Sequence, residues 1–213
     1  MSNEGKFDEK EYKREVETLI TLCENGNYQY VKKIFTKYQF PECIVYECIR
    51  KCFNKYEESK VESVDTMKEL FAHINCNYKR NSESSDGKTI LMILCEKGDY
   101  GLVEIFLKQA KQIIFLNDKD KSDKNVFHHL FIKRYKVEDF VVKIFDLLLS
   151  YYDHTQKSQK ENIKAILREV DNEGKIPLNY ILLNGWNKAL DRYSKIAELS
   201  NYIIPIEQNV CLI

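Results

Sequence analysis

Leu22-Cys23-Glu24-Asn25-Gly26 returns later in the chain as Leu94-Cys95-Glu96-Lys97-Gly98, and a weaker copy follows as Leu182-Leu183-Asn184-Gly185. Apolar residues continue in the same register after the first two glycines. A helix that stops at glycine and is followed by a second apolar helix is a repeat unit. Repeats of this kind stack into extended binding surfaces, so the pattern indicates a partner rather than a reaction.

The period of the repeat is 36 residues, since the apolar pairs that begin at Ile34, Leu70 and Phe106 are equally spaced. This period lies in the range of helical solenoids. Turn-forming residues precede the later copies, at Ser85-Asp86-Gly87-Lys88-Thr89, Asp120-Lys121-Ser122-Asp123-Lys124-Asn125 and Asp171-Asn172-Glu173-Gly174-Lys175. We expect Gly87 and Gly174 to adopt the positive φ that other residues reach only at a cost.

The helix starts after these turns read Thr89-Ile90-Leu91-Met92, Asn125-Val126-Phe127-His128 and Ile176-Pro177-Leu178-Asn179. With the turn before and the glycine after, they resemble the ankyrin repeat. That family's unit is a β-turn finger, a Thr-Pro-Leu-His helix start and a Gly between two antiparallel helices. Pro is kept only at Pro177 and His only at His128, and Asp123 and Arg134 stand where Gly is expected. The resemblance extends from about Tyr12 to Ile204 and is clearest in the third and fifth copies.

The resemblance implies an all-α fold, an ankyrin-like solenoid of stacked antiparallel helix pairs with β-turn fingers. The expected repeats cover about 11–40, 41–80, 81–117, 118–169 and 170–204, between a flexible tail at 1–10 and a C-terminal tail at 205–213. The step from Asp123 to Gly174 is 51 residues instead of 36, so the fourth repeat contains an insertion, 153–170. Inserts in solenoids map to loops on one face, often the binding face.

Apolar periodicity predicts the individual helices. The pairs are expected over 11–36 (divided at Gly26), 42–56 with 64–74, 89–97 with 100–111, 126–135 with 137–152, and 177–184 with 186–200. A further short helix is expected over 161–170, within the insertion. Only 3 prolines and 7 glycines occur in the chain, which agrees with an almost entirely helical structure.

The composition limits the classes of function. The 33 basic and 33 acidic residues balance, whereas nucleic-acid-binding proteins usually carry a basic excess. No apolar run approaches the length of a membrane span, and the start of the chain is polar rather than a secretory leader. With seven cysteines, an odd number, the chain is expected to keep free buried thiols in the cytoplasm, a host cytosol or the nucleus. We expect a monomer that binds neither nucleic acid nor membrane.

Two stretches imitate ligand loops. Gly87-Lys88-Thr89 looks like the end of a phosphate loop, but Ser82 stands where that loop needs its first glycine. Asp118, Asp120 and Ser122 look like the start of a calcium loop, which also needs a glycine and a bidentate glutamate further on. Both stretches are better explained as turns between helices.

Cysteine and histidine provide two further candidates. Cys43, Cys48, Cys52, His73 and Cys76 fall within one repeat, but their spacing does not converge on four zinc ligands. The neighbours His128 and His129 could act in catalysis, yet no nucleophile pattern accompanies them. In ankyrin-like repeats the position of His128 forms hydrogen bonds between fingers, which is the role we expect here. We predict no catalytic residue, no metal, no cofactor and no enzymatic activity.

The resemblance also implies where a partner binds, on a concave face made of the fingers and the exposed side of each first helix. Carried onto this chain, the face comprises Lys88, Glu96, Lys97, Lys121, Lys124, Ile132, Lys133, Asn172, Glu173, Lys175, Leu183 and Asn184. Because lysine is the commonest residue in this set, one hypothesis is a partner with an acidic or phosphorylated segment, anchored on Ile132 and Leu183. The alternative is that these lysines are only solvated turn tips.

The sequence therefore predicts a non-enzymatic protein–protein interaction module. Its richness in Lys, Asn, Ile and Tyr indicates an AT-rich genome, such as that of a protist, an intracellular bacterium or a large virus. The resemblance to ankyrin-repeat proteins of intracellular microbes, viruses or protists then implies an effector that acts in a host cell. The alternative is a structural or inhibitory subunit that covers another protein's site with the 153–170 insertion.

Overall fold

The computed structural model describes residues 9–56, 60–75, 78, 86–110, 114–132, 137–155 and 163–197. Within these ranges the chain forms helices and no strand, so the prediction of an all-α protein is confirmed there. The first helix begins at Glu9, two residues before the predicted start. The rest of the predicted N-terminal tail and the whole C-terminal tail at 205–213 lie outside the described residues.

The chain divides into two compact units. The first compact unit comprises Met1–Arg80 with Ile105–Gln112, and the second comprises Asn81–Glu104 with Ile113–Ile213. The helix α6 (Tyr100–Gln109) therefore contributes residues to both. Each unit is described by itself below.

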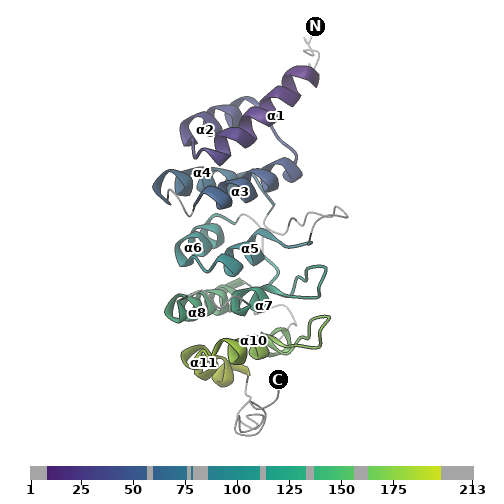
Figure 1. Cartoon of the computed structure of the whole chain (residues 1–213), viewed down its shortest axis with the longest axis vertical. Coiled ribbons are helices and arrows are strands. Elements are labelled where there is room, and N and C mark those ends of the chain that lie inside the picture. Colours follow the sequence, from purple (N-terminus) through teal and green to yellow (C-terminus); the bar gives the residue numbers. More distant parts are fainter. Residues whose placement is uncertain are drawn as a thin grey trace. The chain divides into compact units, whose positions relative to one another are not determined.

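The first compact unit contains two helix pairs, α1 (Glu9–Glu24) with α2 (Tyr28–Lys37) and α3 (Glu42–Tyr56) with α4 (Lys60–Ala72). Short connections make each pair a helical hairpin. The helix α1 packs on α3, and α2 packs on α4 (Figure 1). Leucine, valine, isoleucine and cysteine side chains fill the interface, and the second half of α6 adds Phe106, whose ring lies edge-on to Phe71 at 5.0 Å.

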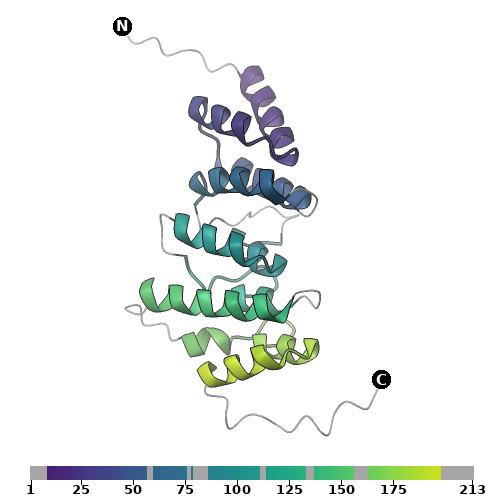
Figure 2. The same ribbon diagram turned by 90° about the vertical axis from the view of Figure 1, so that its left-hand side faces the viewer.

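The second compact unit is built around three short helices, α5 (Ile90–Lys97), α7 (Val126–Phe131) and α10 (Pro177–Asn184). The helix α7 packs against both α5 and α10 (Figure 1). The helices α8 (Glu138–Thr155) and α11 (Asn187–Ala197) pack side by side as the second members of the last two pairs (Figure 2). The observed bounds match the predicted ones closely, except that α7 ends at Phe131 and residues 133–136 are not described.

Aromatic rings form the centre of the second compact unit. Phe145 on α8 lies edge-on to Phe127 and Phe131 of α7, with ring centroids 5.7 and 5.5 Å apart. Tyr193 on α11 stacks against Phe145 at 5.9 Å. All four side chains are almost completely buried, and aromatic pairs in these geometries contribute about 0.5–1.5 kcal/mol each beyond their buried area.

The recurring glycine ends a helix wherever the structure describes it. Gly26, Gly98 and Gly185 have φ of 68°, 76° and 68°, the left-handed conformation in which glycine has no Cβ penalty. At Gly26 the chain reverses with a hydrogen bond from Asn27 N–H to the carbonyl of Leu22 at 2.9 Å. The repeated phrase is therefore a helix stop followed by a sharp turn.

The 153–170 insertion contains the short helix α9 (Ile163–Leu167), which is shorter than the predicted 161–170. Ile166 and Leu167 are buried, and α9 packs against α11. The hydroxyl of Tyr193 donates a hydrogen bond to the Leu167 carbonyl, and the Asn125 side chain donates to the Ile166 carbonyl at 3.0 Å. The described end of the insertion is thus tied to the core of this unit.

Two turn glycines allow a direct test of backbone strain. Gly87 and Gly174 both have a φ near +74°, but a Cβ on Gly87 would lie 3.1 Å from the Lys121 side chain and 3.3 Å from the Lys121 backbone nitrogen, whereas a Cβ on Gly174 meets nothing within 4 Å. We expect Gly174→Ala to cost about 1 kcal/mol of unfolding free energy from the positive φ alone. Gly87→Ala should cost at least about 1 kcal/mol more, because the crowded neighbour is backbone. Urea denaturation of both variants measures this difference, and equal losses would contradict it.

Candidate functional site

Each first helix of the second compact unit follows a turn of the same form. The turns end at Gly87-Lys88, Asp123-Lys124 and Gly174-Lys175. The first residue of each of these pairs has a positive φ, of 73°, 58° and 74° respectively. Asp123 is the one non-glycine residue with positive φ in the described part of the chain. The turn predicted from sequence is therefore kept even where glycine is missing, and aspartate is among the residues that tolerate this conformation.

A buried carboxylate organises two of these turns. Oδ1 of Asp120 accepts hydrogen bonds from the backbone N–H groups of Ser122 and Lys124, at 2.8 and 2.9 Å. Oδ1 of Asp171 accepts the corresponding bonds from Glu173 and Lys175, both at 2.9 Å. Each turn is also closed by a backbone bond, from Asp120 N–H to the Lys124 carbonyl at 3.0 Å and from Asp171 N–H to the Lys175 carbonyl at 2.9 Å.

The second oxygen of each carboxylate reaches the following helix. Oδ2 of Asp120 lies 2.9 Å from His129 Nε2, and Oδ2 of Asp171 accepts a hydrogen bond from the Tyr180 hydroxyl at 2.5 Å. His129 and Tyr180 each stand nine residues after the aspartate, so the two contacts are equivalent. One carboxylate thereby fixes both the shape of a turn and its position on the next helix.

These contacts favour the ionised carboxylates. Burial alone would raise the pKa of Asp171, but hydrogen bonds from the Tyr180 hydroxyl and the Lys175 N–H, together with the Lys124 ammonium, lower it to about 2. Burial also opposes ionisation of Asp120, and hydrogen bonds from His129 and two backbone N–H groups again lower the pKa. Both groups are negatively charged at neutral pH.

Neighbouring turns are joined by backbone hydrogen bonds. Lys121 N–H donates to the Asp86 carbonyl at 3.0 Å, and Asn172 N–H donates to the Ser122 carbonyl at 3.1 Å. Because the donors and acceptors occupy equivalent positions, the same bond is made twice. Repetition of one contact at a fixed register holds the three turns in a row beside their helices.

The residue at the fourth position of each helix start caps its own helix. The backbone N–H of Thr89 contacts Met92 Sδ at 3.4 Å, that of Asn125 donates to His128 Nδ1 at 3.1 Å, and that of Ile176 donates to Asn179 Oδ1 at 2.9 Å. Three different side chains therefore have the same role. Each accepts a contact from a backbone N–H group that the helix itself leaves unpaired.

His128 has a second contact. Its Nε2 donates to the carbonyl of Lys175 in the next turn at 3.0 Å, so the expected structural role between turns is confirmed. Burial lowers the pKa of His128 from 6.5 to about 4, which makes the ring neutral at neutral pH. A neutral ring with Nδ1 as acceptor and Nε2–H as donor satisfies both contacts.

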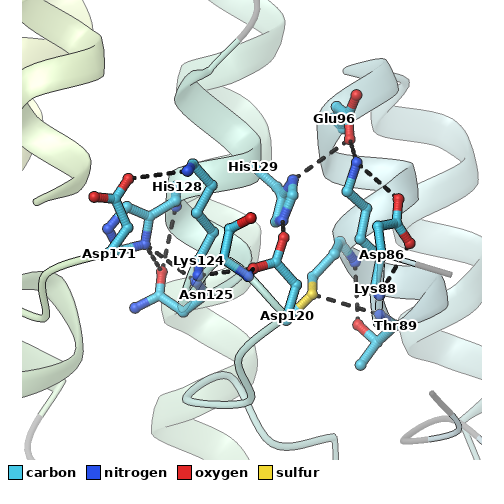
Figure 3. A network of polar contacts seen from close by, with 12 residues as sticks. Asp86, Lys88, Thr89, Glu96, Asp120, Lys124, Asn125, His128, His129 and Asp171 are labelled. Atoms are coloured by element: carbon cyan, nitrogen blue, oxygen red, sulfur yellow. Dashed lines mark hydrogen bonds and ion pairs between the residues drawn. The ribbon is translucent and has the colours of Figure 1, made fainter. Parts of the chain in front are cut away.

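Three of the four turn lysines predicted to contact a partner, Lys88, Lys124 and Lys175, are ion-paired within the protein. Lys88 Nζ lies 2.7 Å from Glu96 and 3.2 Å from Asp86, and Lys124 Nζ lies 3.2 Å from Asp171 (Figure 3). Lys175 Nζ lies 2.6 Å from Glu173, to which Lys124 also extends, at 3.4 Å. Lys124 is only 7% exposed. Lys124 therefore acts first as an internal cation, whereas the Lys175 pair is partly exposed.

His129 connects the ion pairs around Glu96 with the turn carboxylate of Asp120. Its Nε2 faces Asp120, and its Nδ1 lies 3.4 Å from Glu96, the partner of Lys88 (Figure 3). Glu96, predicted to lie on the binding face, therefore bridges α5 to α7. From the sequence alone, His129 is only a rejected catalytic candidate, and Asp120 is only part of a rejected calcium loop.

The other residues predicted to contact a partner differ in how far their side chains are exposed. Ile132 and Asn184 are half-buried, and the Asn184 amide donates to the Phe131 carbonyl at 2.7 Å. Leu183 is the most exposed large apolar side chain in the described residues, at 65%, and its neighbour Leu182 is 40% exposed. Four other members of the set are exposed, namely Lys97, Lys121, Asn172 and Glu173. Lys133 lies outside the described residues.

The cysteine-rich repeat is a second candidate for a metal site, beside the calcium-loop pattern, and the structure describes most of it. Cys48 and Cys52 are buried, Cys43 is exposed, and the His73 ring stacks on Phe35 at 4.2 Å. Cys76 is not described. Among the described residues, no three His, Cys, Asp or Glu side chains gather closely enough to hold a metal ion.

Neither a scan against protein-family models nor a search of curated proteins gives a match for this chain. Every helix in the described part is too short or too polar to cross a lipid bilayer.

The position of Asp120 and Asp171 could have been found from the sequence. Both stand three residues before the turn residue with positive φ and are followed by a lysine one place after that residue. The shared pattern, Asp-x-x-(Asp or Gly)-Lys, was visible, but its meaning depends on which backbone N–H groups the carboxylate faces. Only the folded geometry shows that.

Acidification should lower the unfolding free energy of the second compact unit over the pH range in which His128 gains a proton. The pKa of His128 is lowered from 6.5 in the unfolded chain to about 4 in the folded protein, so the neutral ring contributes its full stability at a pH above about 6.5. That contribution is lost as the pH falls from about 6.5 toward about 4. The loss amounts to at most about 3 kcal/mol. His128→Asn keeps a capping side chain, as Asn179 does in α10, and removes the titration.

We therefore expect the variant to be less stable at neutral pH, where it lacks the bond to Lys175, but to lose less stability on acidification. Urea midpoints at neutral pH and at a pH of about 4.5 provide the measurement. A parallel decline of both proteins would rule out His128 as the source.

A second prediction separates the buried lysine from an exposed one. Lys124→Met removes the cation beside the buried Asp171 and should cost about 2–4 kcal/mol, because an uncompensated buried charge remains. Lys175→Met removes a partly exposed ion pair with Glu173 and should cost less than about 1 kcal/mol. Thermal unfolding followed by circular dichroism gives both values, and similar losses would show that Lys124 has no special role.

Proposed function

We propose that this chain is a non-enzymatic protein-binding module of the ankyrin-repeat type. The observation that carries the proposal is the repetition of one local design in the second compact unit. The turn with positive φ, the cap at the fourth helix position, the bond between neighbouring turns and the glycine stop all recur at matching positions. Such repetition supports a rigid stacked surface, which is how repeat proteins bind partners.

The proposed face is the row of turns and first helices in that unit. Glu96, Ile132 and Leu183 each stand nine residues after the positive-φ residue of their turn, so they occupy one register on neighbouring helices. Leu183 is 65% exposed at the end of α10. An exposed apolar side chain on a well-ordered helix is a candidate anchor, since a few buried apolar contacts commonly dominate binding energy.

The internal ion pairs limit what the turn lysines can contribute to the attraction of an acidic partner. Lys88, Lys124 and Lys175 are each paired with a carboxylate, so these three lysines by themselves do not favour an acidic or phosphorylated segment at this face. Reversing the charge of Lys124 would place a carboxylate beside Asp171 and damage the fold. A test of binding therefore has to begin with Leu183.

The alternative function, a subunit that covers another protein's site with the 153–170 insertion, has less support. In the described part of the insertion, Ile166 and Leu167 point into the core, and Val170, at 52% exposure, is the large apolar side chain left at the surface. Action as an effector in a host cell stays a prediction from composition.

The test compares two exposed apolar residues of the same unit. Leu183→Asp should abolish capture of a partner from eukaryotic cytosolic lysate, because a charge cannot fill an apolar pocket without a large desolvation cost. Val137→Asp changes a side chain of similar exposure, 59%, which stands just before α8 and is not a member of the proposed face. It should leave capture unchanged.

Mass spectrometry of the captured proteins, with circular dichroism to verify folding, gives the result. A protein that is retained by Val137→Asp and lost by Leu183→Asp supports the face. Loss in both variants or in neither would move the binding surface elsewhere.

A further inference from the structure

The outward side of α2 in the first compact unit is basic and aromatic. Its sequence, Tyr28-Gln29-Tyr30-Val31-Lys32-Lys33-Ile34-Phe35-Thr36-Lys37, contains three lysines and no carboxylate. Tyr30 is 56% exposed, and Lys32, Lys33 and Lys37 are exposed as well. A surface helix of a protein with balanced charge usually mixes both signs, so this face is unusual within the chain.

Packing explains which side of α2 faces outward. Val31 and Phe35, four residues apart, are buried, and α2 contacts α1 and α4. The Phe35 ring is stacked on His73 at 4.2 Å, which fixes the rotation of the helix. Tyr30, Lys33 and Lys37 are spaced by three and four residues, so they form one stripe on the opposite side.

Within the part of the chain that the structure describes, two of the three ammonium groups on this face have no carboxylate partner. Lys37 Nζ lies 3.2 Å from Glu11, and that pair accounts for its charge. Lys33 Nζ lies 5.2 Å above the Tyr30 ring, and Lys32 Nζ lies 5.8 Å above the Tyr28 ring. Within the described residues, neither Lys32 nor Lys33 lies within ion-pair distance of an acidic side chain. This differs from Lys88, Lys124 and Lys175 in the second compact unit, which are all neutralised.

We propose that the outward face of α2 binds an acidic segment of a partner protein, through Lys32 and Lys33 with Tyr30 as an apolar contact. Charge complementarity carries the proposal, because an anionic side chain of a partner supplies the neutralisation that the described residues do not provide there. Lysines held above aromatic rings are also partly ordered before binding, which lowers the entropy lost on contact. This surface is separate from the face proposed around Leu183.

The size and chemistry of the face favour an acidic peptide over other anions. A ten-residue helix is about 15 Å long, enough for a few carboxylates of one segment. Proteins that bind nucleic acid tightly neutralise about 6–10 phosphates and usually have a basic excess, whereas this chain has a net charge of zero. The face also has no arginine, the residue preferred for bidentate phosphate recognition.

The experiment uses the full chain and a fluorescein-labelled peptide of about twelve residues, half of them Asp or Glu. Fluorescence anisotropy should show binding that weakens as salt is raised, and no binding of a matched peptide with Asn and Gln in place of the acids. Lys33→Glu should weaken binding at least about fivefold, from the loss of one attraction and the gain of one repulsion.

Lys143→Glu is the matched control. Lys143 is also an exposed lysine above an aromatic ring, 5.6 Å from Phe140, and the substitution changes the net charge equally. Its helix, α8, carries Glu138, Asp139 and Asp146. We expect Lys143→Glu to bind the peptide like the unaltered protein, and Leu183→Asp to do so too, which separates this proposal from the one above.

Three results would overturn the proposal. The first is the absence of measurable binding of the acidic peptide. The second is an equal loss in Lys33→Glu and Lys143→Glu, which would indicate attraction to the whole protein. The third is tighter, Lys33-dependent binding of labelled oligothymidine or of phosphatidylserine vesicles, which would assign the face to nucleic acid or to a membrane surface.

Discussion

The second compact unit depends on a buried aspartate that serves a turn and a helix at once. Asp120 and Asp171 each accept two backbone hydrogen bonds inside a turn and make one contact to a side chain nine residues later. A buried carboxylate without such partners would be strongly unfavourable. Because its hydrogen bonds to the turn and to the following helix lie within one repeat, the turn, the helix start and the register between them form together, and the neighbouring turn can then join by backbone bonds.

This constraint also determines what the lysines of the turns can do. A row of buried carboxylates needs cations, and Lys124 supplies one for Asp171 while being almost completely buried itself. The position that looks from the sequence like a basic binding tip is therefore partly a structural counter-ion. Binding of a partner is left to side chains that the internal network does not use, such as Leu183, and to surfaces where the network is absent, such as the outer side of α2.

The sequence predicted the helices well because their ends depend on local chemistry. Gly26, Gly98 and Gly185 stop helices through a conformation that their own neighbours determine, and the 36-residue period located the pairs. The site was predicted less completely. Position alone suggested that Lys88 and Lys124 face a partner, whereas their pairing with Glu96 and Asp171 depends on contacts between segments eight and 47 residues apart in the chain. Local patterns contain no information about such distances.

Asp123 shows how the fold tolerates departures from the repeat. It adopts φ of 58° where its two counterparts are glycine, yet its turn keeps the same carboxylate bonds and the same link to the next turn. The strain of that conformation, of order 1 kcal/mol, is smaller than the combined contribution of the bonds around it. A turn can therefore lack glycine at this position while the interactions that define the turn persist. This explains why the repeat is easier to see in the hydrogen bonds of the second compact unit than in its residues.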